Sequence, residues 1–162
     1  MVSRSDTKIT AFRITDRRYP PFDGGGAFKW GSRWCSPGRY IIHAASSYAL
    51  AVLENLVHFN IGDIPPGQIF VELGIPSRVS REVLKAADVP GWNSPYPNGV
   101  SESYGDAWYD SRRSAVLVVP STLSPFEHNV LINHTHPDAA RIKISKPRAV
   151  VLDGRLKALI RR

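Results

Sequence analysis

The sequence predicts a single α+β domain, in which a mixed β-sheet forms the core and helices flank it. With 162 residues, the chain is long enough for one hydrophobic core and too short for two comfortable domains. Short apolar or alternating runs typical of strands recur along the chain, and helical periodicity marks one clear segment between them. We therefore treat residues 1–162 as one domain with a core at about 9–156.

The strands are predicted from alternating or continuous apolar runs bounded by turn residues. Residues 114–119, SAVLVV, form a continuous apolar run that indicates a strand buried on both faces. Residues 127–132 form a further short regular segment. The remaining strands are expected at 8–14, 39–44, 68–75, 141–144 and 149–152.

One amphipathic helix is expected at 47–59, because Ser46 and Ser47 are natural N-cap residues and the following residues have helical periodicity. Glu54 lies at the margin of its apolar face. A short capped helix is expected at 80–88, a helical turn at 104–112 and another after Gly154. Loops are expected at 19–26, 60–67 and 89–105. The expected apolar face consists of Ala49, Leu50, Val52, Leu53, Leu56, Val57 and Phe59.

Charge and composition limit the class of protein. The 21 Lys and Arg residues exceed the 14 Asp and Glu residues, which gives a net charge of +7 and favours anionic partners. Part of this excess lies in the tail, at Arg155, Lys157, Arg161 and Arg162. No membrane span or signal peptide is predicted, so we expect a cytoplasmic protein. The single cysteine, Cys35, excludes an internal disulfide.

Three polar groups between Gly31 and Glu54 come from three different local structures. Arg33 lies in a turn between two tryptophans, and an arginine held between indoles is arranged to bind a planar anion such as a phosphate. His43 lies near the end of an apolar strand, and Glu54 can be half desolvated while it still reaches a cleft. Each residue alone also fits a structural role: an arginine packed on an aromatic surface, a hydrogen-bonded histidine, or a solvated glutamate. Together they predict one site.

Ser121 follows a buried strand, where sheet proteins commonly place site residues, although a serine there is also an ordinary turn or cap residue. No GxSxG elbow surrounds it, which disfavours a serine hydrolase. His134 and His136 stand two residues apart without further ligands, too few for a zinc site, so we expect no metal. The glycines after Asp23 match neither the dinucleotide fingerprint nor the phosphate loop.

The chain carries, in order, GSRW and SPG, an apolar strand, a helix with ALAVLE, a buried strand that ends in VPS, then HNVLIN and HPDAARI. This order resembles the RES-domain family of bacterial toxins, which are encoded beside Xre-type antitoxins. The similarity runs over residues 12–156, nearly the whole chain. It implies a fold similar to that of ADP-ribosyltransferases.

The resemblance also implies site residues. The arginine, glutamate and serine for which the family is named correspond to Arg33, Glu54 and Ser121, and Asn129 matches the asparagine of an NxLIN-like segment. The family's tyrosine ten residues after the arginine is replaced by His43, since Tyr40 would point to the opposite face of the strand. Either His43 takes over the stacking and hydrogen bonding of that tyrosine, or this member has altered activity.

The implied reaction consumes NAD by hydrolysis, phosphorolysis or transfer of ADP-ribose to a protein. Arg33 would hold a phosphate or a ribose hydroxyl, and His43 would position the nicotinamide ribose. Glu54 would stabilise the oxocarbenium-like transition state, with Ser121 on the nicotinamide side and Asn129 supporting the pocket. Nicotinamide leaves as a neutral molecule, so no general acid is needed.

The implied partner is an Xre-type antitoxin that blocks the active site, and contact with nucleic acid is expected only through that antitoxin. A protein target for ADP-ribose is a further expected partner. The main alternative is a small basic RNA-binding protein or ribonuclease that uses His43, His128 or His134. It would explain the charge but not the ordered motifs. A non-enzymatic binding module is a third interpretation, if the substitution at His43 has disabled the site.

Overall fold

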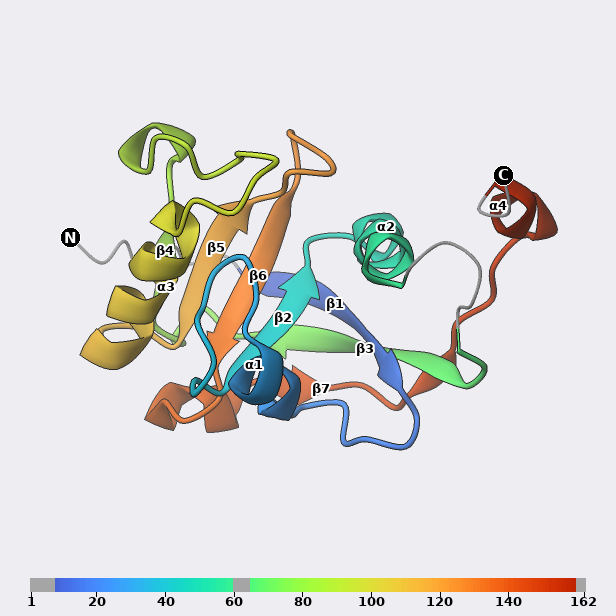
Figure 1. Cartoon of the computed structure of the whole chain (residues 1–162). Coiled ribbons are helices and arrows are strands. Elements are labelled where there is room, and N and C mark those ends of the chain that lie inside the picture. The colour runs from blue at the N-terminus through green and yellow to red at the C-terminus, as the bar shows by residue number, and fades with distance from the viewer. Residues whose placement is uncertain (1–7, 60–64, 160–162) are drawn as a thin grey trace.

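One mixed β-sheet organises the chain. The computed structural model describes residues 8–59 and 65–159, and within them the strands form an eight-stranded sheet in the order β4-β5-β6-β2-β1-β3-β7, with β8 also paired to β3 (Figure 1). The β4–β5 pair is parallel and the other pairs are antiparallel. The strands are β1 (Ile9–Asp16), β2 (Ile41–Ala45), β3 (Gln68–Ile75), β4 (Arg81–Val83), β5 (Val116–Pro120), β6 (His128–Asn133), β7 (Lys143–Ile144) and β8 (Arg148–Ala149). The expected α+β domain is confirmed.

Helices α1, α2 and α3 flank one face of this sheet (Figure 1). Helix α2 contacts β1 and β2, and α1 contacts β2. Helix α3 packs its buried Trp108 against Leu117 and Val119 of β5. None of the described helices is long and apolar enough to cross a membrane. The helices are α1 (Gly25–Trp30), α2 (Tyr48–His58), α3 (Val100–Ser111) and α4 (Gly154–Leu159), with 3₁₀ turns at Ala86–Asp88 and Pro137–Arg141.

Strand β5 is buried on both faces, as its continuous apolar run predicts. Val116 and Val118 belong to one core cluster, whereas Leu117 and Val119 belong to a second cluster on the opposite face. Alternate side chains of a strand point to opposite faces, so one strand serves both clusters. Because Val119 is paired with Asn129 of β6, Asn129 lies on the face that the helices cover.

The predicted apolar face of α2 is wrong in part. Leu50 and Ala51 are buried and form a cluster with Ala45 of β2, but Leu53 is 43% exposed and Val57 is 65% exposed. Hydrophobic periodicity fixes the angles between side chains, whereas the position of the sheet decides which side is covered. The helix is rotated so that Glu54, together with its neighbours along that side, faces inward.

Three other segments differ from the sequence prediction. The expected helix at 80–88 is instead strand β4 followed by a 3₁₀ turn, because Arg81–Val83 pairs in parallel with β5. The expected loop at 89–105 is shorter, since α3 begins at Val100. Part of the expected loop at 19–26 forms helix α1. The expected loop at 60–67 falls largely outside the described residues.

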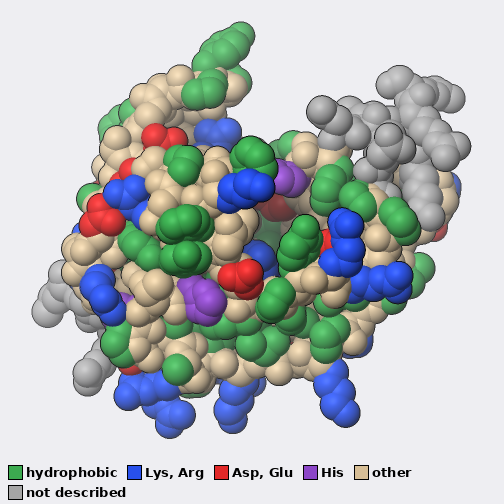
Figure 2. Space-filling model, turned by 60° about the horizontal axis from the view of Figure 1, so that its bottom comes forward, with side chains coloured by type: hydrophobic (Ala, Val, Ile, Leu, Met, Phe, Trp, Pro, Cys, Tyr) green, Lys and Arg blue, Asp and Glu red, His purple; other side chains and the backbone are tan. Residues whose placement is uncertain are grey.

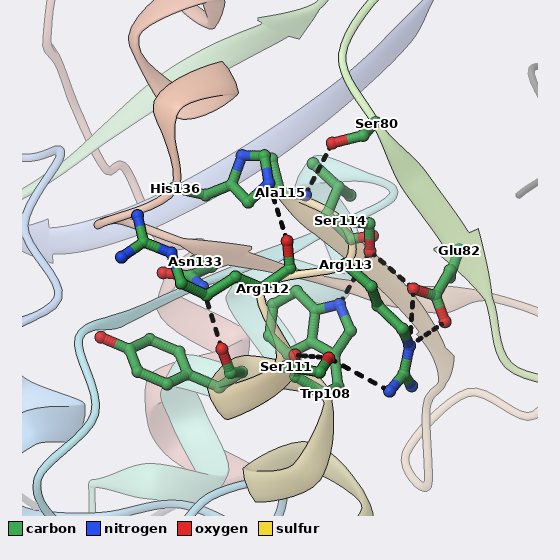
Figure 3. A network of polar contacts seen from close by, with 12 residues as sticks. Ser80, Glu82, Trp108, Ser111, Arg112, Arg113, Ser114, Ala115, Asn133 and His136 are labelled. Carbon is green, nitrogen blue, oxygen red and sulfur yellow. Dashed lines mark hydrogen bonds and ion pairs between the residues drawn. The ribbon is translucent and has the colours of Figure 1, made fainter.

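A polar network fastens the end of α3 to the edge of the sheet (Figure 3). Trp108 donates its indole N–H to Ser114 Oγ at 2.8 Å, and Ser114 donates to Glu82 Oε1 of β4 at 2.9 Å. Glu82 also pairs with Arg113, whose Nε lies 2.9 Å from Oε1. Buried polar groups with partners of this kind hold a single arrangement, so α3 is a rigid support for the segment that packs on it.

Candidate active site

A cavity of about 730 Å³ opens between the helices and the sheet. Figure 2 shows this hollow, with acidic, basic and histidine side chains visible in and around it. The volume lies in the range of small-molecule and cofactor sites. Its walls come from α1, the turn after it, β1, β2, α2 and the ends of β5 and β6. The polar or charged residues that line it are Arg13, Ser32, Arg33, His43, Glu54, Asn55, His58, Thr122 and Asn129.

Glu54 is held by two neutral donors. Helix α2 begins at a capped residue, since Ser47 Oγ accepts from the Leu50 amide at 3.0 Å. Glu54 lies between one and two turns further along, and its Oε1 accepts from Asn129 Nδ2 at 2.8 Å and from Ser121 Oγ at 3.2 Å. Among the described residues both donors bind the same oxygen, so Oε2 keeps its lone pairs for a ligand in the cavity.

Ser121, directly after β5, and Asn129 of β6 both reach Glu54 from the β5–β6 hairpin. Ser121 is completely buried directly after β5, and its Oγ accepts from the amides of Leu123 at 3.1 Å and Ser124 at 3.2 Å. It therefore shapes the hairpin loop and binds the carboxylate with one hydroxyl, without lining the cavity itself. Asn129 lines the cavity, and its buried Oδ1 has no hydrogen-bond partner within the described residues.

Arg33 lies across the cavity in a tight turn. Gly31 has a φ of 70°, a value that favours glycine, and Ser32 and Cys35 close the turn by pairing their backbones. The guanidinium is exposed, and its Nη1 donates to the carbonyls of Trp92 at 3.1 Å and Ser94 at 3.2 Å. The turn is therefore tied to the loop before α3.

The predicted packing of Arg33 between two indoles is wrong. Trp34 is buried and stacks on Trp92, with ring centroids 6.3 Å apart, whereas Trp30 is 75% exposed. The cation over the Trp30 ring is Lys29, at 4.7 Å from the centroid. The two indoles lie apart, because Trp34 belongs to the core cluster under α3 and Trp30 lies at the cavity rim. Backbone carbonyls position the guanidinium instead.

Helix α3 supports the turn from below. Asp106 accepts from the Ser36 amide at 2.9 Å and from the Ser36 hydroxyl, and Arg39 Nη2 pairs with Asp110 at 2.6 Å. A Cβ at Gly105 would lie 1.7 Å from the Trp34 carbonyl oxygen, so only glycine allows this close approach. The position of Arg33 thus depends on a helix about seventy residues later in the chain.

His43 projects from β2 into the same cavity. Its Nε2 lies 2.9 Å from Ser32 Oγ, the residue before Arg33. Burial lowers the pKa of His43 to about 4, and the positive charge of Arg13 adds to the effect. The ring is therefore neutral at physiological pH, so one ring nitrogen is free to accept a hydrogen bond. This histidine acts as a hydrogen-bonding group and not as a cation.

Comparison with known proteins identifies the family. The sequence model of the RES domain matches residues 10–153, most of the chain. This chain belongs to the RES domain family. The Prs ADP-ribosylating toxin of Sphingobium sp. (strain YBL2) is 44% identical over 136 residues, which are 82% of this chain and 84% of that protein. Toxin Res of Yersinia enterocolitica is 35% identical over 154 residues, which are 90% of this chain and 98% of that protein.

A solved structure shares the fold of this RES domain. The crystal structure of the M. tuberculosis MbcT–MbcA toxin–antitoxin complex matches with a TM-score of 0.74, over 96% of this chain and 90% of that chain. The sequence identity is 15%, so this likeness concerns the fold. It agrees with the mixed sheet and flanking helices described above.

The RES domain brings all five predicted site residues together. Arg33, His43, Glu54 and Asn129 line one cavity, and Ser121 bonds to Glu54 from behind. His134 and His136 lie elsewhere and bind backbone: His134 Nδ1 accepts from the Gly24 amide at 3.4 Å and His136 Nδ1 from the Asp138 amide at 3.1 Å. Across the described ranges, no group of three potential metal ligands is present.

Sequence reasoning missed five polar residues of this cavity: Arg13, Ser32, Asn55, His58 and Thr122. His58 follows Glu54 by four residues, a helical spacing that was available as a signal once Glu54 was selected. Asn55 directly follows Glu54, and no spacing rule indicated it. Arg13 of β1 is different. Because side chains alternate along a strand, the Arg13 side chain points to the face of β1 opposite α2. It reaches the cavity because β1 and β2 are paired only at Phe12 and Ala45 and leave a gap beyond that pair. No local pattern could have indicated it.

Proposed function

We propose that this RES domain is the toxin of a toxin–antitoxin system and that it cleaves the nicotinamide–ribose bond of NAD. The observation that carries the proposal is the carboxylate of Glu54, held by Asn129 and Ser121 in a cavity that Arg33 also lines. The family assignment favours this function over the RNA-binding alternative. In a cavity of about 730 Å³, a dinucleotide fits better than a polymer.

Cleavage of the glycosidic bond develops positive charge on the ribose carbon and ring oxygen. The negative charge of Glu54 stabilises this oxocarbenium-like state, and its free Oε2 accepts a hydrogen bond from a ribose hydroxyl. Asn129 and Ser121 keep the carboxylate fixed, so it does not reorient as the charge develops. The leaving group is neutral nicotinamide, which explains why the cavity needs no acid beside Glu54.

Arg33 and His43 are proposed to position the substrate. The guanidinium of Arg33 is exposed to the cavity and held by two carbonyls, which suits a phosphate oxygen. The neutral ring of His43 replaces the tyrosine expected for the family, and through Ser32 it also steadies the turn that carries Arg33. In this role His43 supports binding geometry and transfers no proton.

We propose a protein side chain as the acceptor of ADP-ribose, since the Sphingobium relative is named for ADP-ribosylating Prs. Water and phosphate are the alternative acceptors. Incubation of the purified chain with NAD labelled in its adenylate part, with and without a cell extract, distinguishes them. Transfer places the label on protein, hydrolysis yields free ADP-ribose, and phosphorolysis requires added phosphate. Failure to release nicotinamide under any of these conditions would refute the proposed reaction.

The proposed partner is an Xre-type antitoxin that covers the cavity, since the matched fold occurs in a toxin–antitoxin complex. The test is expression with and without the neighbouring gene product, while growth and cellular NAD are followed. We expect growth arrest and NAD loss only in the absence of the partner. Arrest with unchanged NAD would favour slow modification of a protein target over bulk NAD consumption.

A further inference from the structure

The most exposed aromatic side chains of this chain gather around the opening of the cavity. Phe126 is 96% exposed, Tyr96 is 78% exposed and Trp30 is 75% exposed, and no other Phe, Tyr or Trp among the described residues exceeds 59%. A single exposed aromatic residue is ordinary, but three from separate segments around one opening indicate a contact surface. We call these three side chains the aromatic rim.

Each rim residue is next to a part of the site already described. Trp30 lines the cavity at the end of α1. Tyr96 lies two residues after Ser94, whose carbonyl accepts from Arg33. Phe126 lies in the loop between β5 and β6, the hairpin that holds the carboxylate of the site. Figure 1 shows this loop and the loop before α3 at the same end of the sheet, so the rim residues flank one opening.

The loop that carries Tyr96 is closed by its own hydrogen bonds. Asn98 Nδ2 donates to the Gly91 carbonyl at 2.9 Å, and the Ser94 amide donates to the same carbonyl at 3.1 Å. Prolines stand on both sides of Tyr96 and restrict the backbone there. A side chain on such a loop loses little conformational freedom when it binds a partner, so Tyr96 is arranged as an anchor.

The loop that carries Phe126 is also fixed from within. Ser121 Oγ accepts from the amides of Leu123 and Ser124, and the Glu127 amide donates to the Ser124 carbonyl at 2.9 Å. Because Phe126 is almost fully exposed, it contributes little to the hydrophobic core. Its ring is therefore available to a partner.

The charge beside the rim is positive. Lys29 Nζ lies 4.7 Å from the centroid of the Trp30 ring, and Lys29 has no carboxylate partner in the described part of the chain. The carboxylate of Glu127, next to Phe126, already accepts from the Ser124 hydroxyl at 2.9 Å. With a net charge of +7 on the chain, the rim matches a surface that combines apolar and acidic side chains.

We propose that the aromatic rim is the surface on which the acceptor protein docks, through an apolar and acidic patch beside the side chain that receives ADP-ribose. This inference rests on the proposed function, because it requires transfer to protein. The acceptor atom bonds to the ribose carbon as neutral nicotinamide leaves, and the acceptor's proton passes to water.

The form of the rim favours an acceptor protein over other occupants. Water or phosphate as the acceptor needs no docking surface. Three separate anchors around an opening suit a transient complex that releases its modified product, whereas a stable partner such as an antitoxin needs a larger and more continuous apolar surface.

Label transfer by a rim variant tests this surface. The double variant Tyr96→Ser/Phe126→Ser is incubated with NAD labelled in its adenylate part, without and with a cell extract. Nicotinamide release without extract should equal that of the parent, because neither side chain lines the cavity. Transfer of label to protein should fall about tenfold or more, as expected for the loss of two aromatic anchors. The matched control Tyr19→Ser, at an exposed tyrosine outside the cavity, should change transfer less than about twofold.

Competition tests docking without cleavage by the variant. At saturating NAD, an excess of the Glu54→Gln chain should inhibit label transfer by the parent chain, because it occupies the acceptor protein. The same chain with Tyr96→Ser and Phe126→Ser should not inhibit. If the double variant lacks the cooperative urea unfolding of the parent, the two single variants replace it, each with a several-fold loss of transfer.

Parental transfer by the rim variants, or an equal loss in Tyr19→Ser, would overturn the docking surface. Parental transfer together with lost binding of the neighbouring gene product would assign the rim to the antitoxin, and together with lost self-association in gel filtration to a second copy of the chain. A parent chain that labels no protein also contradicts the proposal. Nicotinamide release without labelled protein leaves the cleavage reaction standing, whereas no release under any condition refutes the reaction itself.

Discussion

Replacement of Glu54 by glutamine separates charge from shape at the centre of the cavity. Asn129 and Ser121 both donate to Oε1, and a carboxamide oxygen at that position accepts the same two hydrogen bonds. The amide nitrogen then replaces Oε2, so the atom that faces the ligand changes from a charged acceptor to a neutral donor. Glu54→Gln therefore removes the interaction with the oxocarbenium-like state while it keeps the hairpin contact.

The expected magnitudes differ between activity and folding. Loss of one preorganised electrostatic contact costs about 10²- to 10³-fold in rate, or about 2.7 to 4 kcal/mol. A charged hydrogen bond exceeds a neutral one by about 1 kcal/mol, and removal of a half-buried charge offsets part of that, so the unfolding free energy should change by less than about 2 kcal/mol. The assay is nicotinamide release from NAD by the purified chain, beside urea unfolding of the same sample.

The matched control is Glu102→Gln, the same substitution at an exposed residue of α3 outside the cavity, which should leave the rate unchanged. Parental nicotinamide release by Glu54→Gln would refute the role of the carboxylate. A Glu54→Gln chain that does not fold would refute the argument that glutamine satisfies both donors.

Further predictions concern the support of the site. Gly105→Ala should destabilise the fold by about 3 kcal/mol or more, since its Cβ would overlap the Trp34 carbonyl, whereas Gly26→Ala, with open space around it, should be near neutral in the same urea titration. Ser121→Ala should lower the unfolding free energy by about 1 to 3 kcal/mol and slow NAD cleavage several-fold, because its buried hydroxyl serves two amides and Glu54; unchanged values for both would contradict its role. Because the pKa of His43 falls from 6.5 to about 4, the folded chain binds fewer protons than the unfolded chain between these values, and stability is lost as pH falls through that window. Between pH 7 and pH 4.5, the unfolding free energy of the parent chain should therefore fall by roughly 2 to 3 kcal/mol more than that of His43→Gln, as measured by unfolding titrations at both pH values. An equal fall in both proteins would show that another group is responsible.

Local sequence patterns specified most elements that hold the site. The continuous apolar run of β5 predicted a doubly buried strand, and the serine cap with helical periodicity predicted α2. Motif order related Arg33, Glu54, Ser121 and Asn129 to one another before any geometry was available. These signals are local because they depend on backbone periodicity, capping and turn chemistry, each of which is determined within a few residues.

Contacts between distant segments decided the rest. Residues 81–83 are a strand because β5 offers a parallel edge, although their own pattern suggested a helix. The sheet under α2 decided that Glu54 points inward and Leu53 outward, which periodicity alone cannot do.

The sequence by itself determined an α+β domain, the order of its main strands and helices, and the identities of the residues that meet near Glu54. Only the tertiary structure decided that carbonyls of the loop before α3 position Arg33, and that Arg13 enters the cavity through the gap between β1 and β2. The physical reason is that both arrangements depend on hydrogen bonds between residues 30 or more positions apart, and no local pattern encodes such contacts.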